Sequence, residues 1–214
     1  MKRFRAVSRA AIVALLALSV ATCGDDGGSS GPPLFVGTLI VPPPGQCAGC
    51  SVSGVSLAVQ QLRQDAPPQT VATVTTDAGG NYDTGQLAQG LLGSGVILVA
   101  NVNPNTGAGI GGVESPRGGR NEKDFDVTTQ IACVASVFLT AGPPPSAPCT
   151  VSPTQDPALI DNQRIEILEE AASFIADRAV LPDDEARGAC AVIVCTAAGG
   201  GRASPECVNG LFDA

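Results

Sequence analysis

The sequence predicts an α+β protein, in which an N-terminal antiparallel β-sandwich is followed by a small helical region that carries most of the cysteines. Between residues 34 and 127, short apolar runs with period-two alternation are separated by turns rich in Gly and Pro, as is typical of a sandwich. After residue 127 the apolar residues recur every three to four positions, which indicates amphipathic helices. A Pro-rich linker at residues 142–150 interrupts this second region.

The expected strands of the first region are short and end at Gly or Pro. They are separated by a Pro-Pro-Pro-Gly turn, by Pro67-Pro68 and by a Gly-rich interval, and a long Gly-rich hairpin at residues 103–122 precedes the last of them. The strands are predicted at residues 34–41, 55–60, 69–76 and 95–101, with a final short strand at Phe125 and Val127.

The second region, residues 128–214, predicts four helices. Thr128 and Thr129 can cap a helix over residues 130–140, although Val134, Val137 and Phe138 would also suit a buried strand. The other helices are predicted from capping residues and apolar spacing: one from Asp156-Pro157 to about residue 180, one from Pro182 to the glycines at 199–201, and a short one after Ser204.

The first 22 residues form a targeting segment. Four basic residues precede an apolar run over residues 10–21, which as a helix would rise roughly 18 Å and fall short of the ~30 Å hydrocarbon core of a bilayer. This arrangement is typical of an export signal peptide. Residues 23–33 are rich in Gly, Ser and Asp and predict a flexible tether.

The residues Val20-Ala21-Thr22-Cys23 resemble the lipobox of bacterial lipoproteins. The resemblance implies that Cys23 is acylated, becomes the N-terminus of the mature chain and is the attachment to the membrane. In that family Gly24, rather than Asp, after the cysteine implies sorting to the outer membrane, on its periplasmic or surface face. The alternative is an ordinary secretory signal with an incidental cysteine.

Three segments of the β-rich region resemble the carboxypeptidase regulatory-like domain, a transthyretin/CnaB-like sandwich. They are Val36-Gly37-Thr38, Gly54-Val55-Ser56-Leu57-Ala58-Val59 and Thr75-Thr76-Asp77 followed by Gly80-Asn81-Tyr82. The resemblance implies a non-catalytic module over residues 34–127. Within the last motif, Asp77 is expected to close an Asx turn, Gly80 to adopt a positive φ, and Tyr82 to point into the sandwich.

Composition excludes several kinds of chemistry. The chain of 214 residues has no His, so it has no Ser–His or Cys–His nucleophile and no imidazole metal ligand. It has 12 basic and 20 acidic residues; loss of residues 1–22 removes four basic residues and leaves 8 against 20, a net charge of −12. This balance argues against a nucleic-acid partner and against electrostatic binding to anionic lipid.

Two groups of carboxylates have functional interpretations. Asp77, Asn81 and Asp83 have part of the spacing of a calcium loop, but position six is Tyr82 and no Glu stands at position twelve, so a plain turn is the better interpretation. Glu166, Glu169, Glu170 and Asp177 suggest paired catalytic carboxylates, but a solvated helix face explains them better. Arg117 and Arg120 lie in a Gly-rich loop that does not predict an anion site, and neither a cofactor nor a metal is expected.

The eight cysteines predict disulfides in an exported chain. Cys47-Ala48-Gly49-Cys50 is interpreted as a local structural disulfide, with redox and metal-binding interpretations as alternatives. If Cys23 carries acyl chains, seven cysteines remain, and at least one must be free or paired between molecules. Spacing does not assign the partners of the other five, which are Cys133, Cys149, Cys190, Cys195 and Cys207.

The functional hypothesis is a non-enzymatic, lipid-anchored protein of the cell envelope with a structural or interaction role. Its expected partners are the membrane, through the N-terminal acyl chains, and an envelope protein or glycan. The alternatives are an exported redox or thiol protein that uses Cys47 and Cys50, and a small-ligand binder in the helical region.

Overall fold

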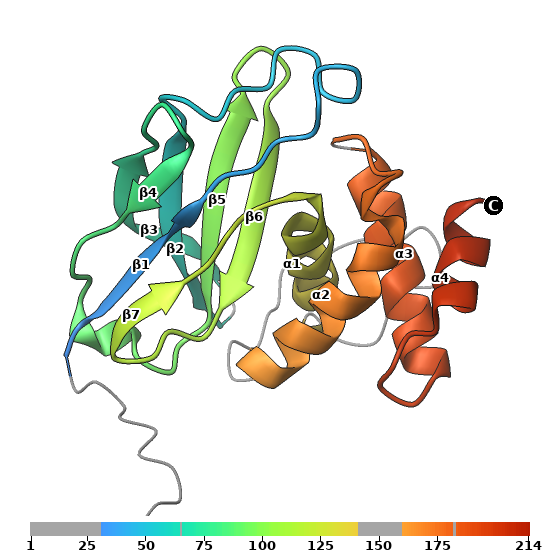
Figure 1. Ribbon diagram of the computed structural model, residues 1–214. Coiled ribbons are helices and arrows are strands. Elements are labelled where there is room, and N and C mark those ends of the chain that lie inside the picture. Colours follow the sequence, from blue (N-terminus) through green and yellow to red (C-terminus); the bar gives the residue numbers. More distant parts are fainter. Residues whose placement is uncertain (1–30, 65, 141–159, 182) are drawn as a thin grey trace, which may run out of the picture.

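The computed structural model describes residues 31–214, except residues 65, 141–159 and 182 (Figure 1). The leader, Cys23, most of the tether, the Pro-rich linker and Cys149 therefore lie outside the described residues, as does the cap expected at Asp156. The described part has mixed α and β content, with two sheets and four α-helices. None of its helices is both long enough and apolar enough to cross a membrane.

Two sheets form the β-rich part. The four-stranded sheet is antiparallel, and its strands in spatial order are β3 (Ala66–Thr75), β2 (Ser56–Arg63), β5 (Val96–Asn103) and β6 (Ala108–Glu114). In the three-stranded sheet, β1 (Pro33–Thr38) lies between β4 (Asn81–Asp83) and β7 (Gly119–Glu122). Strand β1 pairs antiparallel with β4 and parallel with β7.

The two sheets pack face to face around one apolar cluster. Phe35 and Phe125 come from the side of the three-stranded sheet, and Leu57, Val59 and Leu98 come from the four-stranded sheet. All five side chains are fully buried. Alternate residues of β2 and β5 therefore face this core, as the period-two pattern predicts.

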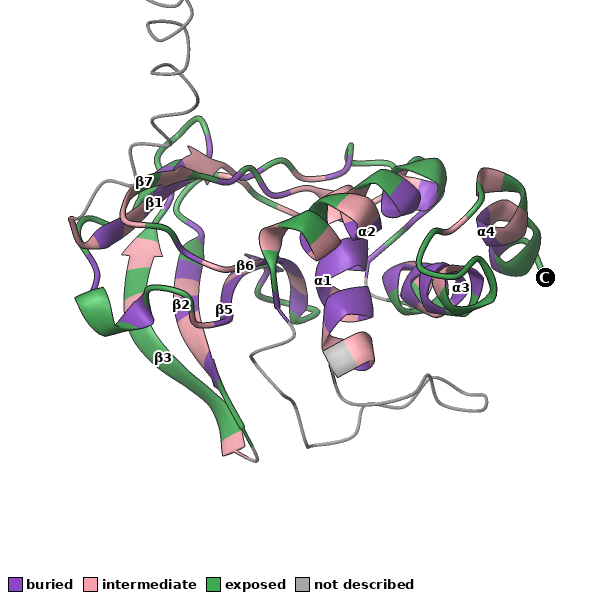
Figure 2. Cartoon of the chain, turned by 90° about the horizontal axis from the view of Figure 1, so that it is seen from below, coloured by how far each residue is buried: buried purple, intermediate pink, exposed green. Residues whose placement is uncertain are grey.

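The helices pack against the other face of the four-stranded sheet on its β6 side (Figures 1 and 2). Ile97 and Val113 of the sheet share a buried cluster with Cys133 and Ile165. Strand β5 is consequently buried on both faces. The helices are α1 (Val127–Thr140), α2 (Asn162–Ala176), α3 (Asp183–Ala198) and α4 (Pro205–Phe212), and they enclose a further core of their own.

The last strand expected from the sequence is wrong. Phe125 forms a single parallel bridge with Leu39, and Val127 already belongs to α1. The helix starts there because Asp126 caps it: the Asp126 carboxylate accepts the N–H of Thr129, and the Thr129 hydroxyl accepts the N–H of Asp126. The cap expected at Thr128 and Thr129 is therefore displaced, and the strand alternative for this segment is wrong.

The second helix is shorter than expected. Helix α2 begins after Asp161, whose side chain accepts the N–H of Arg164, and it ends at Ala176 rather than near residue 180. The start of α3, its end before the glycines at 199–201, and the Ser204 cap of α4 confirm the prediction.

The turn before β4 also confirms its prediction. The Asp77 carboxylate accepts the N–H groups of Gly79 and Asn81, at 2.8 and 2.9 Å. Gly80 has a φ of +83°, and a Cβ there would lie 2.7 Å from the carbonyl oxygen of Leu39. Tyr82 is buried between the sheets.

Candidate functional site

Lys123 lies where the two sheets and α2 meet. Its N–H donates to the carbonyl of Val36, and its own carbonyl accepts the hydroxyl of Tyr82 at 2.5 Å. A Cβ at Gly37 would lie 1.9 Å from that carbonyl oxygen, so only glycine fits beside it. These contacts hold the backbone of Lys123 against β1.

The Lys123 side chain is buried, with only 8% exposed, and it is ion-paired. It passes over Gly112 of β6, where a Cβ would lie 3.2 Å from its Cε. Its ammonium group contacts Glu169 of α2 and lies 3.5 Å from Glu114 of β6. The lysine thus joins the sheet to the helical layer.

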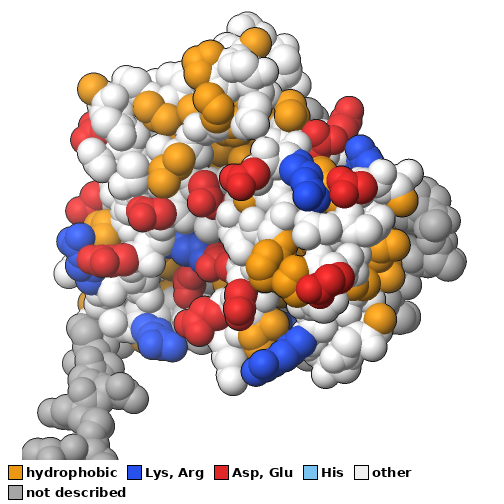
Figure 3. Space-filling model, turned by 45° about the vertical axis from the view of Figure 1, so that its right-hand side comes forward, with side chains coloured by type: hydrophobic (Ala, Val, Ile, Leu, Met, Phe, Trp, Pro, Cys, Tyr) orange, Lys and Arg blue, Asp and Glu red, His pale blue; other side chains and the backbone are white. Residues whose placement is uncertain are grey.

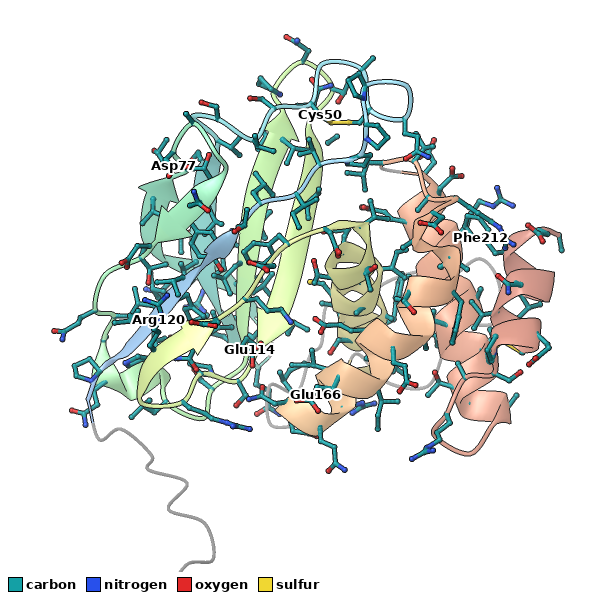
Figure 4. The ribbon with its side chains drawn as sticks, viewed as in Figure 1. Cys50, Asp77, Glu114, Arg120, Glu166 and Phe212 are labelled. Carbon is teal, nitrogen blue, oxygen red and sulfur yellow. A yellow bond between two sulfur atoms is a disulfide. The ribbon has the colours of Figure 1, made fainter. Side chains whose placement is uncertain are left out.

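These residues form the floor of an acidic groove of about 390 Å³. The groove lies between the end of β6, the segment around β7 and the first turns of α2, and Figure 4 shows Glu114 and Glu166 coming from its two sides. Figure 3 shows carboxylates gathered on this face. Its lining comprises Glu114, Glu122, Lys123, Asp124, Asp126, Thr129, Asn162, Ile165, Glu166 and Glu169.

The carboxylates of the groove differ in how they are used. Asp124 accepts the N–H of Thr38 and Asp126 caps α1, while Glu122 pairs with Arg120 on the surface. Glu166 is exposed, and its carboxylate makes no hydrogen bond or ion pair with any described residue. Glu166 is therefore available to a partner.

Burial changes the proton affinity of the inner carboxylate. Desolvation raises the pKa of Glu114 above its usual range, and the neighbouring Glu169 acts in the same direction, while Lys123 partly offsets both. Burial also raises the pKa of Tyr82 far above that of a free phenol, so its hydroxyl remains a donor to Lys123. The floor of the groove therefore holds two carboxylates that share the ammonium group of one lysine.

A second polar hollow of about 480 Å³ lies beside the groove, on the three-stranded sheet, and shares three residues with it. The shared residues are Glu122, Lys123 and Asp124. The two hollows therefore adjoin along these three residues, between β4 and α2.

The residues of the possible calcium loop form hydrogen bonds within their local turns. The Asp77 carboxylate is also bonded to the Asn81 side chain, and hydrogen bonding to Asn81 is the main cause that lowers the pKa of Asp77. The Asp83 carboxylate accepts the N–H of Gly85 at 2.7 Å. In the part of the chain that the structure describes, no group of three or more acidic or cysteine side chains could hold a metal ion.

The four carboxylates predicted on α2 are not one cluster. Glu169 turns inward to Lys123, which the solvated-face interpretation did not foresee, and Glu166 lines the groove. Glu170 is exposed, and Asp177 is the C-cap residue of α2 beside a different hollow. Arg120 pairs with Glu122 at 3.0 Å on the surface, and the backbone N–H of Arg117 is bonded to Asn121.

The cysteines of the described part are bonded, except one. Cys47 and Cys50 form a disulfide in the loop between β1 and β2, where no helix begins, and Cys195 of α3 is bonded to Cys207 of α4. Cys190 is also disulfide-bonded. Cys133 is free and buried between α1 and the sheet, and burial raises the pKa of its thiol to about 12.

A buried polar chain links β6, α1 and α3. The Gly111 N–H donates to the Gln130 side chain, whose amide donates to Glu185 at 3.0 Å. The other oxygen of Glu185 is buried without a partner among the described residues. Burial raises the pKa of Glu185 to about 8, which favours the protonated carboxyl.

The helical region has a hollow of its own, of about 530 Å³. Its walls are largely apolar and come from the C-terminal end of α1, the start of α2 and the end of α3. Ile167 and Leu168 belong to this lining, with Arg164 and Asp161 at its edge.

Sequence reasoning missed Lys123 as a site residue. The signal was present, because alternation counted back from the buried Phe125 places Lys123 on the inner face and the acidic Glu122 and Asp124 outside. Its partners were not accessible in the same way, since Glu114 and Glu169 come from elements distant along the chain.

Comparisons with known proteins add little. No protein-family model matches the chain, and no curated protein matches it. Among solved structures, the crystal structure of a 9R-lipoxygenase from Cyanothece PCC8801 aligns with 10% identity and a TM-score of 0.28. The alignment covers 76% of this chain and 24% of that one, so this chain spans about a quarter of the length of the lipoxygenase.

Proposed function

We propose that this chain is a non-enzymatic protein of the cell envelope, anchored in the outer membrane by acyl chains on Cys23, and that its folded part acts by contact with an envelope partner. The leader and the lipobox-like residues support the anchor. The fold of the Asp77–Tyr82 turn supports a transthyretin/CnaB-like type for the two packed sheets.

The acidic groove carries the contact role. The lysine on its floor is already neutralised by Glu114 and Glu169, whereas Glu166 at the rim is exposed and unpaired in the described part. A concave surface with spare negative charge suits a cationic segment of a partner protein better than a neutral glycan. Lys123 and the cysteines in this part of the chain have structural partners or are buried.

The contact role is tested by titrating the protein with a Lys/Arg-rich peptide. We expect Glu166→Gln to weaken binding by roughly threefold to tenfold, because it removes one rim charge. The matched control is Glu170→Gln, which removes the same charge from α2 outside the groove and should leave binding unchanged. Equal effects of the two variants, or no binding by the parent protein, would contradict the groove.

The anchor is tested by intact mass spectrometry of the detergent-extracted protein, with and without alkylation after denaturation. A chain that begins at Cys23 and carries acyl mass is expected, and the control variant Cys23→Ser should lack that mass. Cys133 should appear among the alkylated residues. A water-soluble parent protein without acyl mass would refute the anchor and leave the groove test unaffected.

A second candidate is a small-ligand site in the helical region, which the apolar hollow beside Ile167 favours. An apolar fluorescent dye should bind the parent protein and a variant of the exposed Phe174 of the same helix, but not Ile167→Asp. That result would support the small-ligand site.

A further inference from the structure

The two edges of the four-stranded sheet differ in whether their backbone N–H and carbonyl groups have hydrogen-bond partners. At the β6 edge, helix side chains supply partners: Gln130 of α1 accepts the Gly111 N–H, and Asn162 of α2 bonds both the N–H and the carbonyl of Ser115. At the opposite edge, β3 pairs with β2 and with no other strand of the described part. Figure 2 shows β3 on the outside of the sheet, away from the helices.

The hydrogen bonds of β2 show which groups of β3 are free. The N–H of Leu62 donates to the carbonyl of Gly95, just before β5, so the backbone groups of Leu62 point toward β5. Those of Leu57, Val59 and Gln61, which alternate with Leu62, therefore point toward β3. Their partners in register, which point back to β2, are Val74, Ala72 and Gln69. The residues whose N–H and carbonyl groups point away from the sheet are therefore Thr70, Thr73 and Thr75.

This edge lacks the usual protection of an exposed strand. Residues 69–75 contain no charged residue and no proline, and all but Ala72 and Val74 are exposed. Monomeric proteins commonly guard such an edge with charges, prolines or bulges. Here Pro67 and Pro68 and the irregularity at Val71 limit the open stretch to its C-terminal part without closing it.

The charges around β3 favour a second copy of this chain as the partner of this edge. Without residues 1–22 the chain carries a net charge of −12, so two copies repel each other overall, but the β3 edge is neutral. Arg63, the last residue of β2, donates to the carbonyl of Pro67 near the start of β3, at 2.9 and 3.2 Å. Asp77 lies just beyond the other end of β3. Antiparallel pairing of two copies places Arg63 of each near Asp77 of the other.

We propose that β3 is a self-association edge, at which a second copy of this chain pairs antiparallel with β3 and joins two four-stranded sheets into one. Pairing of a strand with its own copy is isologous and closes after two molecules. Because helix side chains already occupy the β6 edge, the joined sheet cannot extend further.

The test is sedimentation equilibrium of the exported chain carrying Cys23→Ser, so that acyl chains cannot cause association. A dimer whose fraction rises with concentration is expected. Thr73→Pro removes one outward N–H per copy and should raise the dissociation constant roughly tenfold or more. Thr73→Lys keeps the N–H but places like charges together and should have the same effect.

Two controls separate the edge from general effects. Thr73→Val keeps the N–H and the branched side chain and should dimerise as the parent does, and Ser173→Lys adds the same charge on α2 and should also dimerise. Circular dichroism checks that each variant is folded. A parent protein that is monomeric throughout, including one that binds an extended peptide instead, overturns the proposal, as do Thr73→Pro and Thr73→Lys variants that dimerise normally.

Discussion

Lys123 shows how one buried charge can organise three elements. Its ammonium group lies between Glu114 of β6 and Glu169 of α2, while its backbone is bonded to Val36 and Tyr82. Removal of the cation leaves two partly buried carboxylates without their partner, which costs more than the net contribution of the pair.

Lys123→Met is accordingly expected to lower the free energy of unfolding by about 3 kcal/mol. The matched control is Arg120→Met, which breaks the exposed pair with Glu122 and should cost at most about 0.5 kcal/mol. Urea denaturation measures both. Equal costs for the two variants would show that Lys123 has no special structural role.

Glu185 makes stability depend on pH. Its carboxyl has a pKa of about 8 in the folded chain against 4.5 for an ordinary Glu, so the folded state holds the proton more tightly. The resulting stability is fully present below pH 4.5, and it decreases as the pH rises toward 8. Glu185→Gln should retain the bond to Gln130 and abolish this decrease.

The measurement is urea denaturation of the parent and the variant between about pH 5 and about pH 9. Toward the alkaline end, the free energy of unfolding of the variant should rise relative to that of the parent by at least about 1 kcal/mol. Parallel curves for the two proteins would mean that the carboxyl is ionised throughout the range. The variant is compared with the parent at each pH because the raised pKa of Glu114 also makes the stability of both proteins depend on pH.

At the scale of elements, α4 depends on a covalent bond. It has eight residues, too few for an isolated helix to persist in water, and it packs Val208 and Phe212 into the helical core. The Cys195–Cys207 disulfide holds it against α3. Arg187 of α3 adds a hydrogen bond to the Phe212 carbonyl, and its guanidinium group lies above the Phe212 ring.

Cys195→Ala combined with Cys207→Ala is expected to lower the free energy of unfolding by about 3 kcal/mol, since the bond closes a loop of 12 residues. Removing Cys47 and Cys50, which are three residues apart, should cost less because that loop is much shorter. Hydrogen exchange should locate the loosened backbone in α4. Unchanged protection of α4 would show that packing alone holds it.

The elements that the sequence predicted correctly are those with local causes. The turn at Asp77 follows from its own side chain and from Gly80, and α4 follows from its Ser204 cap. The boundary at Val127 was missed because the reciprocal bonds of Asp126 and Thr129 decide it, and Thr is not the usual residue at that position of a capping box. The acidic groove depends on contacts between distant segments, which periodicity does not reveal.

At the scale of the molecule, the helical layer and the sheets share a core. Ile97 and Val113 of the sheet pack with Cys133 and Ile165 of the helices, so the regions predicted as 34–127 and 128–214 bury a common surface. Such sharing favours a single cooperative unfolding transition.

We therefore expect two probes at different places in the structure to give the same midpoint of urea denaturation. The first is the fluorescence of Tyr82, the only tyrosine in a chain without tryptophan, which lies between the sheets. The second is alkylation of Cys133, which lies between the sheet and α1. A thiol that becomes reactive well before Tyr82 is exposed would show that the helical layer detaches first.

The position of β1 governs when the chain can fold during its synthesis. This strand is made early, yet both of its neighbours, β4 and β7, come later, and β7 ends only at Glu122. Until that point has left the ribosome, Phe35 has no complete sheet around it. Pairing over such a separation is slow and exposes apolar surface to aggregation. A nascent chain interrupted before residue 119 therefore leaves an unfinished three-stranded sheet, which makes it a substrate for proteases and chaperones.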